Sequence, residues 1–418
     1  MKKQVPHLLV AIDLGASGTK IVASVVGQPD CKAVLMEPHC AQVNDRQLLT
    51  PDPQFDEHNV WVRIAEKFYA VGNLALIKHN ATNKLKPAKF TIAVPKICAA
   101  IGVFAQKFNL PDKFDLSITF VLPPAEWEQR TIVIEQLQVA IKDLEIPRGK
   151  IKPRLLNIYP YPEGMGILLG QKLDLKEFKA VTVVMLGFRN ASVFTSRYGT
   201  VSRPQSSDLG FHDLVFEIAG KTGYKTSDMI VPIFEYERYT GIARFYTKIL
   251  DDLQTQIVLW EFKSRDERYG RTPPVLGDIR KYQEYIDEFN ANAEKTLDSL
   301  LRCSGEDRVT ELKNLMKIID RVHEAYWTKL SDWLEEVMLS QSDKICLCGG
   351  TADYFEDKLK EFMKDKAYAQ SEKNVSFHGL IKPPDSLHVY NNRFDDIYSL
   401  WHQMSQQQLV INQAGRSR

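Results

Sequence analysis

Short apolar runs that end in glycine-containing turns recur along the chain, and they predict a layered α/β fold. His7–Ile12 reads as a buried strand, and the β-branched run Thr19–Val26 reads as the strand that returns beside it. Ala180–Leu186 and Ala191–Ser196 repeat this strand–turn–strand pattern, and Lys344–Cys348 is a further short apolar strand. Strands that alternate with helical segments favour sheets covered by helices.

Helical periodicity lies between these strands and, above all, in the second half of the chain. Lys89–Phe108 and Glu126–Leu144 carry apolar residues at helical spacing. Residues 229–340 are rich in charge and in helical periodicity, and Glu311–Leu339 predicts long amphipathic helices. The polar residues 406–418 predict a loose tail after the last ordered helix.

Length, charge and cysteine usage narrow the class of protein. The chain has 418 residues, which predicts at least two domains. Lys and Arg number 54 and Asp and Glu number 53, so the formal charge of +1 gives no case for binding nucleic acid or a membrane surface directly. No stretch of about 18 apolar residues without charge predicts a transmembrane helix. The six cysteines are scattered and no export signal is evident, so we expect reduced thiols in a cytoplasmic protein.

Three glycine-containing turns, each after an apolar strand, are candidates for binding phosphate. Glycine lets backbone N–H groups approach phosphate oxygens, because no Cβ intervenes. Lys20 can add a positive charge at the β- or γ-phosphate, and Asp13 can hold a hydrated Mg²⁺. Any one of these turns also fits a purely structural role, so the hypothesis depends on the order and spacing of all three. We call them turn 1 (Asp13–Lys20), turn 2 (Gly187–Asn190) and turn 3 (Gly349–Thr351).

These motifs, in this order, resemble the actin-like ATPase superfamily, and within it the bacterial ParM/StbA-type plasmid-segregation proteins. Turn 1 resembles the first phosphate loop of that family and turn 2 the second phosphate loop. Cys348–Ala352, which contains turn 3, resembles the adenosine loop. Asn157–Leu169 and Tyr390–Phe394 resemble the two segments that connect the domains.

The resemblance implies an α/β, actin-like fold of two duplicated, ribonuclease H-like domains with a nucleotide cleft that binds ATP or ADP. Domain I would comprise residues 1–162 and 385–405. Domain II would comprise residues 163–384, with a helical insertion at about 229–340, and residues 406–418 would form a flexible tail.

The resemblance also assigns roles to single residues. Asp13 would support Mg²⁺ through water and take part in hydrolysis, and Glu163 would orient the attacking water. Without the resemblance, Glu163 fits a glutamate that begins a helix and is favoured by the helix dipole. The residues implied in nucleotide binding are Gly15, Ala16, Ser17, Gly18, Lys20, Gly187, Phe188, Arg189, Asn190, Gly349, Gly350 and Thr351.

The second phosphate loop departs from the pattern of the family. Met185 stands where an aspartate is expected, and a thioether is a poor ligand for a hard cation such as Mg²⁺. Three alternatives stay open: a slipped register, slow hydrolysis that relies on Asp13 and Glu163, or nucleotide binding without turnover. We also consider that Arg189 takes over part of the charge neutralisation at the γ-phosphate; an exposed arginine in a turn is the alternative.

The sequence therefore predicts an actin-like, ATP-binding protein that forms nucleotide-dependent filaments in plasmid or DNA segregation, with weak or slow ATP hydrolysis. Its partners would be further copies of itself and a DNA-binding adaptor protein, and the helical region would contribute filament or partner contacts. A non-polymerising nucleotide-binding scaffold is the alternative. A small-molecule kinase on the same fold would need a catalytic base beside a substrate pocket, and no motif for one is present.

Overall fold

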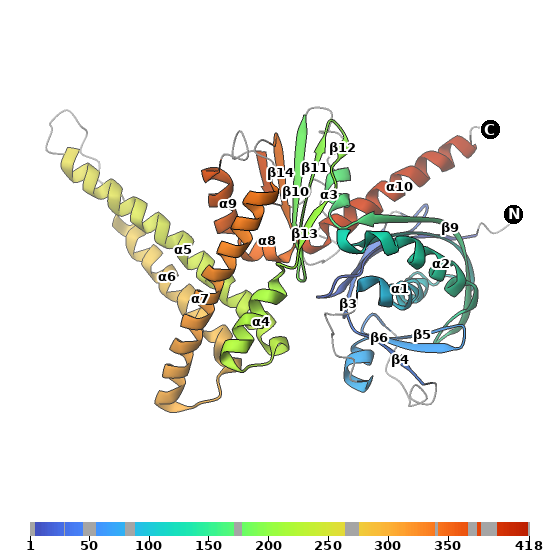
Figure 1. Ribbon diagram of the computed structural model, residues 1–418, viewed down its shortest axis with the longest axis horizontal. Coiled ribbons are helices and arrows are strands. Elements are labelled where there is room, and N and C mark those ends of the chain that lie inside the picture. Colours follow the sequence, from blue (N-terminus) through green and yellow to red (C-terminus); the bar gives the residue numbers. More distant parts are fainter. Residues whose placement is uncertain are drawn as a thin grey trace. The chain divides into compact units, whose positions relative to one another are not determined.

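Two β-sheets built on the same strand order carry the fold, as the computed structural model shows (Figure 1). In each sheet a first strand pairs antiparallel with the next strand in sequence and parallel with a later one, which in turn pairs parallel with the last. The first sheet runs in the order β3 (Cys31–Met36), β2 (Thr19–Val25), β1 (His7–Asp13), β7 (Lys113–Leu122), β9 (Gly149–Pro162), β8 (Leu144–Ile146), β5 (Asn59–Ile64), β6 (Lys67–Gly72) and β4 (Cys40–Val43).

The second sheet repeats the first five positions of that order. Its hairpin and its two parallel strands correspond one by one to those of the first sheet, which is the arrangement that a duplicated fold predicts. The order is β12 (Thr200–Val201), β11 (Ala191–Arg197), β10 (Ala180–Leu186), β14 (Lys344–Cys348) and β15 (Val375–Phe377), and β13 (Gln205–Ser207) also pairs with β11.

The chain divides into two compact units. The structure describes residues 5–28, 30–44, 56–79, 88–170, 178–263, 276–338, 342–366, 374–377 and 391–416. Unit 1 comprises residues 1–210, 337–353 and 362–418 and holds both sheets, whereas unit 2 comprises residues 211–336 and 354–361 and is helical. These bounds follow the predicted helical insertion more closely than the predicted division at residue 162. The two actin-like domains stay a prediction, and the expected return of the chain at residue 385 lies outside the described residues.

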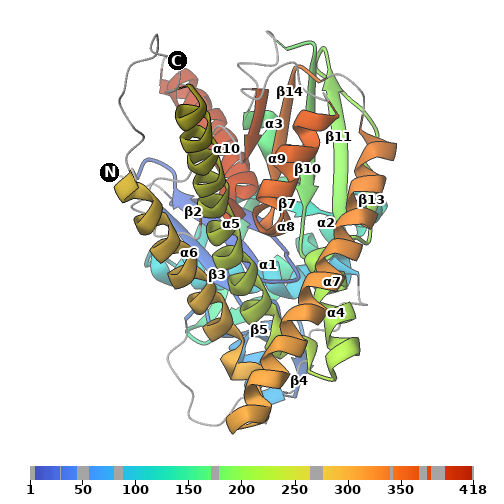
Figure 2. The ribbon, with the colours of Figure 1, turned by 90° about the vertical axis from the view of Figure 1, so that its left-hand side faces the viewer.

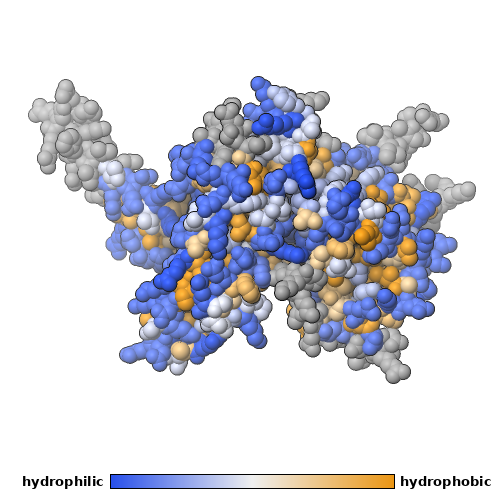
Figure 3. Space-filling model, in the orientation of Figure 1, coloured by the Kyte–Doolittle hydropathy of each residue, from blue (hydrophilic) through white to orange (hydrophobic). Residues whose placement is uncertain are grey.

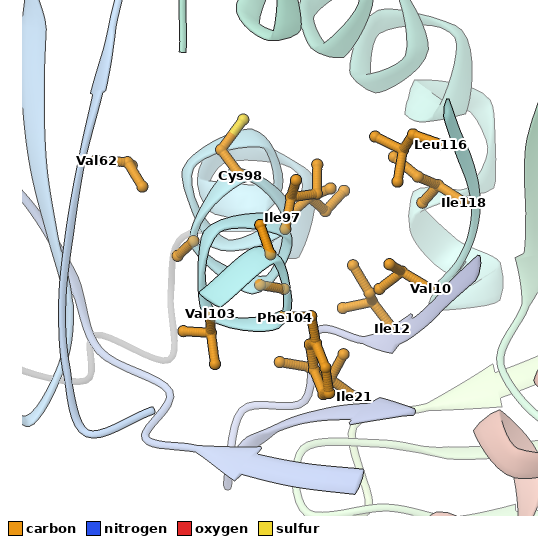
Figure 4. Packing of buried hydrophobic residues seen from close by; sticks show 14 of the residues in the cluster. Val10, Ile12, Ile21, Val62, Ile97, Cys98, Val103, Phe104, Leu116 and Ile118 are labelled. Carbon is orange, nitrogen blue, oxygen red and sulfur yellow. The ribbon is translucent and has the colours of Figure 1, made fainter. Parts of the chain in front are cut away.

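Helix α1 (Ala93–Lys107) forms the centre of the first core in unit 1. Its residues from Ala93 to Ala105 are all buried, Lys96 among them, as expected for a helix surrounded by strands. Figure 4 shows Ile97, Val103 and Phe104 of this helix among side chains from the surrounding strands, such as Val10 and Leu116. The stretch Lys89–Lys107 is long and apolar enough for a membrane span, but 78% of its apolar window is buried inside the protein, as in a core helix.

Two further helices of unit 1 flank the connecting segments. Helix α3 (Met165–Gly170) follows β9, and helix α10 (Asp395–Arg416) follows the short η10 (Asn391–Phe394). Helix α10 packs on α3 and on β1, β2 and β7. The loose tail predicted from residue 406 is wrong in its secondary structure, because helix α10 continues to Arg416. The apolar side chains described in this core run from Phe394 to Met404. The sequence that follows is mostly polar but includes Leu409, Val410 and Ile411.

Unit 2 consists of long helices, as predicted. They are α4 (Phe211–Thr222), α5 (Thr226–Lys263), α6 (Leu276–Leu297) and α7 (Gly305–Val337). Helices α5 and α6 lie side by side (Figure 2), and Tyr246 of α5 stacks on Phe289 of α6 with ring centroids 5.9 Å apart. In the space-filling view the visible surface of these helices is mostly hydrophilic with smaller apolar patches, as expected for amphipathic helices (Figure 3).

Candidate functional site

Turn 1 joins β1 to β2 and brings a carboxylate and an ammonium together. The antiparallel register places Asp13 opposite Lys20, and Lys20 Nζ donates a hydrogen bond to Asp13 Oδ2. Both side chains are about nine-tenths buried. A Cβ on Gly15 would lie 2.5 Å from the carbonyl oxygen of Gly18, so the turn requires glycine at position 15. Asp13 Oδ1 is buried and accepts no hydrogen bond from the described residues.

A second buried ion pair lies beside turn 1. Glu163 follows the end of β9, where its backbone N–H donates to the carbonyl oxygen of Leu122 over 2.9 Å. Lys89, which begins η3 (Lys89–Ile92) just before α1, donates a hydrogen bond from Nζ to Glu163 Oε1. Their side chains are 10% and 7% exposed, so this pair is shielded from water almost completely.

Burial and neighbouring charges set the ionisation of this group. Burial lowers the pKa of Lys89, but Glu163 and Asp13 outweigh it and hold that pKa above its ordinary value, so Lys89 stays an ammonium. Burial raises the pKa of Asp13, but Lys20 and Lys89 outweigh it and hold that pKa low, so Asp13 stays a carboxylate. Burial and Asp13 raise the pKa of Glu163 against the attraction of Lys89.

Turn 2 approaches the Lys89–Glu163 pair through Arg189. The backbone N–H of Gly187 donates to the carbonyl oxygen of Asn190 over 2.9 Å and closes the turn, which also contains Phe188. Arg189 Nη1 lies 3.6 Å from Oε1 of Glu126, in η4 (Pro124–Gln129), and Glu126 Oε2 accepts the backbone N–H of Phe90 over 3.0 Å. Phe90 is the residue after Lys89, so Glu126 contacts both Arg189 of turn 2 and the backbone next to the Lys89–Glu163 pair. Arg189 is therefore not an isolated surface arginine, and its role toward a phosphate stays a prediction.

The end of β10 carries no carboxylate. Met185 is half-buried, pairs with Cys348 in the parallel register of β10 and β14, and its Sδ lies 3.3 Å from Cys348 Sγ. A Cβ on Gly164, next to Glu163, would lie 3.6 Å from Cβ of Met185. Met185, at the position where an aspartate was expected, therefore lies next to the Glu163–Gly164 segment, and its sulfur contacts that of Cys348.

Turn 3 is bonded directly to turn 2. Gly349 has a φ of 96°, and a Cβ there would lie 2.2 Å from the carbonyl oxygen of Leu186, so only glycine fits. Thr351, in helix α8 (Gly350–Tyr354), is fully buried and donates from Oγ1 to the carbonyl oxygen of Gly187 over 2.6 Å. Gly350, which begins α8, has no atom within 4 Å of the place a Cβ would take.

The second connecting segment contributes an arginine and an aspartate to the same region. Arg393 Nη2 donates to Ser17 Oγ over 3.0 Å and so contacts turn 1. Asp396 accepts the backbone N–H groups of Gly164 over 2.8 Å and of Ile167 over 3.2 Å, and thereby fixes the segment that holds Glu163. Burial, opposed by these two N–H groups and reinforced by Asp13, raises the pKa of Asp396 to about 7.

Contacts connect the three turns by way of the second connecting segment. They run from Ser17 of turn 1 to Arg393 and Asp396, from Asp396 to the segment that holds Glu163, and from there through Lys89 and Glu126 to turn 2 and turn 3. Sequence reasoning missed four residues of this group; Arg393 alone had a signal, because it lies in the segment that resembles the second connection. The acids of the group are Asp13, Glu126, Glu163 and Asp396, and the bases are Lys20, Lys89, Arg189 and Arg393. The buried Lys96 lies close enough to Lys89 and Asp13 for their charges to shift its pKa.

The donor atoms suit a metal ion only in part. In the described part of the chain no three His, Cys, Asp or Glu side chains are grouped as a metal site. The orphaned Asp13 Oδ1 supplies one hard oxygen, which fits a hydrated Mg²⁺ held mainly by phosphate oxygens. Asp13 is the one metal ligand that the sequence predicted, and among the described residues the end of β10 supplies no carboxylate because Met185 stands there.

Comparisons with known proteins show similarity of fold. No family model and no curated protein matches the chain. A Bacillus thuringiensis ParM hybrid protein solved with ADP aligns with a TM-score of 0.51 and 14% identity, over 97% of this chain and 49% of that one. The apo ParM protein of pSK41 aligns with a TM-score of 0.48 and 12% identity over 97% and 98% of the two chains. Ta0583, an archaeal actin homolog, aligns with a TM-score of 0.47 and 12% identity over 96% and 99%.

The chain has an actin-like α/β fold with two sheets of like strand order. The resemblance to actin-like proteins predicted from the sequence is thus confirmed for the fold. The ParM hybrid protein is among the structures that share this fold, at an identity of 14%, which shows likeness of fold and not of activity.

Proposed function

We propose that the chain is an actin-like nucleotide-binding protein that forms nucleotide-dependent filaments in plasmid or DNA segregation, with weak or slow ATP hydrolysis. One observation carries the nucleotide-binding part of the proposal. Three glycine turns from distant parts of the sequence contact one largely buried group of charged side chains that includes Lys20, Lys89 and Arg393. The similarity in fold to a ParM hybrid solved with ADP supports it.

Each turn has a separate task in this proposal. Turn 1 and Lys20 bind the phosphates from one side, and turn 2 with Arg189 binds them from the other. Turn 3 faces the adenosine. Mg²⁺, when bound, would neutralise phosphate charge, and Asp13 Oδ1 would orient its hydration shell.

Glu163 is the residue best placed to accept a proton from an attacking water. Its Oε1 is occupied by Lys89, so Oε2 is the oxygen left for water. Asp396 holds the backbone of Gly164 and so limits the movement of Glu163. Met185 provides no carboxylate at the end of β10, where the resemblance implies a second group that orients water and metal, and we therefore expect slow turnover.

The resemblance to actin-like proteins supports filament formation, which can be tested in solution. Ultracentrifugation with ATP, with ADP and without nucleotide distinguishes a filament former from a non-polymerising scaffold. ATP-dependent pelleting supports a filament former, because head-to-tail contacts that do not close give open filaments. A protein that binds nucleotide and stays in the supernatant at all concentrations is instead a non-polymerising scaffold. If the chain forms filaments, we further propose that it acts in the cytoplasm and contacts DNA through a DNA-binding adaptor protein.

Nucleotide binding itself is tested with Lys20→Met. Removing the ammonium of turn 1 should weaken ATP binding by about 10- to 100-fold, since a charge-assisted contact to phosphate contributes about 1.5–3 kcal/mol. Lys150→Met is the matched control: it removes a lysine paired with Asp143 on the surface of the same unit, and should leave the affinity unchanged. Arg189→Ala tests the second turn in the same titration. Equal affinities of Lys20→Met and the wild type would refute the site.

A further inference from the structure

The Lys89–Glu163 pair is the most deeply shielded charge pair of the site and belongs to none of the three turns. Lys89 lies near three carboxylates, those of Glu163, Asp13 and Glu126. A hydrogen bond fixes it to Glu163, and its side chain is 10% exposed. A buried ammonium in such surroundings is held in place, because moving it away would leave carboxylates buried and uncompensated.

Both carboxylates with predicted roles in the chemistry already have an ammonium partner. Lys20 bonds one oxygen of Asp13, and Lys89 bonds one oxygen of Glu163. A divalent cation that approached between them would meet two ammonium groups of like charge. The position that would normally add a second hard ligand carries the thioether of Met185, whose sulfur faces Cys348.

The geometry points to Lys89 as a cation that the protein itself supplies to the nucleotide site. Its ammonium compensates the charges of Asp13 and Glu163, where a protein-bound Mg²⁺ would otherwise be needed. Nucleotide therefore binds with only a weak requirement for divalent cations. This inference rests on the proposed function, because it concerns the same site. It goes further by assigning a role to a residue outside the three turns and by setting the metal requirement of the site.

The test is the affinity for a fluorescent ATP analogue, titrated in excess Mg²⁺ and again in excess EDTA. The measured quantity is the ratio of the two dissociation constants. For the wild type we expect a loss of less than about tenfold in EDTA. In Lys89→Met the ratio should rise by about 10- to 1000-fold, because a neighbouring opposite charge changes an ionic equilibrium by about that factor. Lys89→Arg keeps the charge and should return the ratio toward that of the wild type.

A second variant covers the case in which Lys89→Met fails to fold. Glu163→Gln keeps the ammonium and removes the negative charge of its partner, so that more of the charge of Lys89 is available to phosphate. This variant should bind the analogue in EDTA at least as tightly as the wild type does. Lys150→Met, at the exposed Lys150–Asp143 pair, serves as the control and should reproduce the wild-type ratio.

The outcomes separate the inference from the function on which it rests. A wild-type ratio as large as that of Lys89→Met, or an unchanged ratio in Lys89→Met, overturns the role of Lys89 while nucleotide binding stands. Weaker binding of Glu163→Gln than of the wild type in EDTA also overturns it. If the wild type binds no analogue with or without Mg²⁺, the proposed function fails, and the inference fails with it.

Discussion

Gly349 and Gly350 are neighbours in turn 3 but differ in what a side chain would meet. At Gly349 a Cβ would collide with the carbonyl oxygen of Leu186 and the φ of 96° would strain any other residue. At Gly350 the space is open, and the residue begins a helix. The sequence alone shows two adjacent glycines and cannot say which of them is required, because the collision involves a strand more than 160 residues away in sequence.

Substituting the two glycines separately tests this difference. Gly349→Ala should lower the free energy of unfolding by about 2–4 kcal/mol, since backbone strain and overpacking each cost about 1–3 kcal/mol. Gly350→Ala is the matched control and should be neutral or stabilise by up to about 1 kcal/mol. Urea unfolding of both variants measures the effect. Equal losses would show that turn 3 does not approach β10 as closely as described.

Asp396 is expected to make stability depend on pH in the direction opposite to most carboxylates. Its pKa is about 7 in the folded chain, against an ordinary value of 3.8. Because the folded value is the higher one, its contribution to stability is complete below pH 3.8 and is lost as the pH rises through about 7.

The variant Asp396→Asn isolates this contribution. Between about pH 5 and pH 8 the wild type should lose about 2–3 kcal/mol relative to Asp396→Asn, since a tenfold change in proton affinity corresponds to about 1.4 kcal/mol. The variant also carries a constant loss, because an amide accepts fewer of the two N–H bonds. Urea unfolding across this pH range measures both effects. Parallel pH profiles would place the pKa of Asp396 near its ordinary value.

Other residues of the site differ in how far they could be predicted. Asp13 and Lys20 share one turn, so their pairing follows from a local hairpin register. Lys89 and Glu163 are 74 positions apart and meet only because β9 and the start of α1 lie next to each other in the fold. No local pattern marks Lys89, which in the sequence is one lysine at the start of an apolar helix.

At the scale of elements, helix α10 shows where patterns succeed and where they fail. Its first turns carry apolar side chains that pack on β1, β2 and β7, and the sequence predicted a helix there. Beyond Met404 the sequence is rich in glutamine, and the helix nevertheless continues to Arg416 through a stretch that includes Leu409, Val410 and Ile411. Short buried strands were easier to place, because they are apolar runs bounded by turns, and β1, β10 and β14 lie within a residue or two of the predicted bounds.

Trp401 is expected to anchor helix α10. It is 8% exposed, and its Nε1 donates to Ser24 Oγ of β2 over 3.1 Å. Trp401→Ala should cost about 3–5 kcal/mol of unfolding free energy, as for other large aromatic truncations in cores. Trp401→Phe keeps most of the packing and should cost about 1–2 kcal/mol through the lost hydrogen bond and smaller ring.

Thermal unfolding of these variants checks the anchoring role of Trp401. Gln407→Ala, on the exposed side of the same helix, is the control and should change stability by less than about 0.5 kcal/mol. A loss in Trp401→Ala no larger than in Gln407→Ala would show that the helix is not anchored there.

At the scale of the whole molecule, the chain divides into two compact units. The duplication seen in the strand order of unit 1 was implied by the resemblance to actin-like proteins, and the order itself had no signal in the sequence because it depends on pairing between distant strands. In unit 2, the periodicity of Glu311–Leu339 predicted helix α7, whereas the pairing of helices depends on aromatic contacts such as Tyr246 with Phe289.

Two units predict two unfolding transitions. Calorimetry should resolve them, because each unit buries its own apolar side chains. Nucleotide should raise the midpoint of the unit 1 transition alone, by the equivalent of about 2.7 kcal/mol at a hundredfold excess over the dissociation constant. Hydrogen exchange of peptides from residues 7–25 and 305–337 assigns each transition. A single transition that nucleotide shifts as a whole would show that the units unfold together.

Gly210, the last residue of unit 1 before the chain enters the helical unit, is pressed against turn 2. A Cβ at this position would lie 2.3 Å from the carbonyl carbon of Arg189 and 2.5 Å from the carbonyl oxygen of Phe188. Tension that pulls on the chain at Phe211 therefore acts on turn 2 almost directly. Mechanical load on the helices would deform a turn that the proposal places at the phosphates, so the rate at which nucleotide escapes becomes a quantity that an optical trap can measure against force.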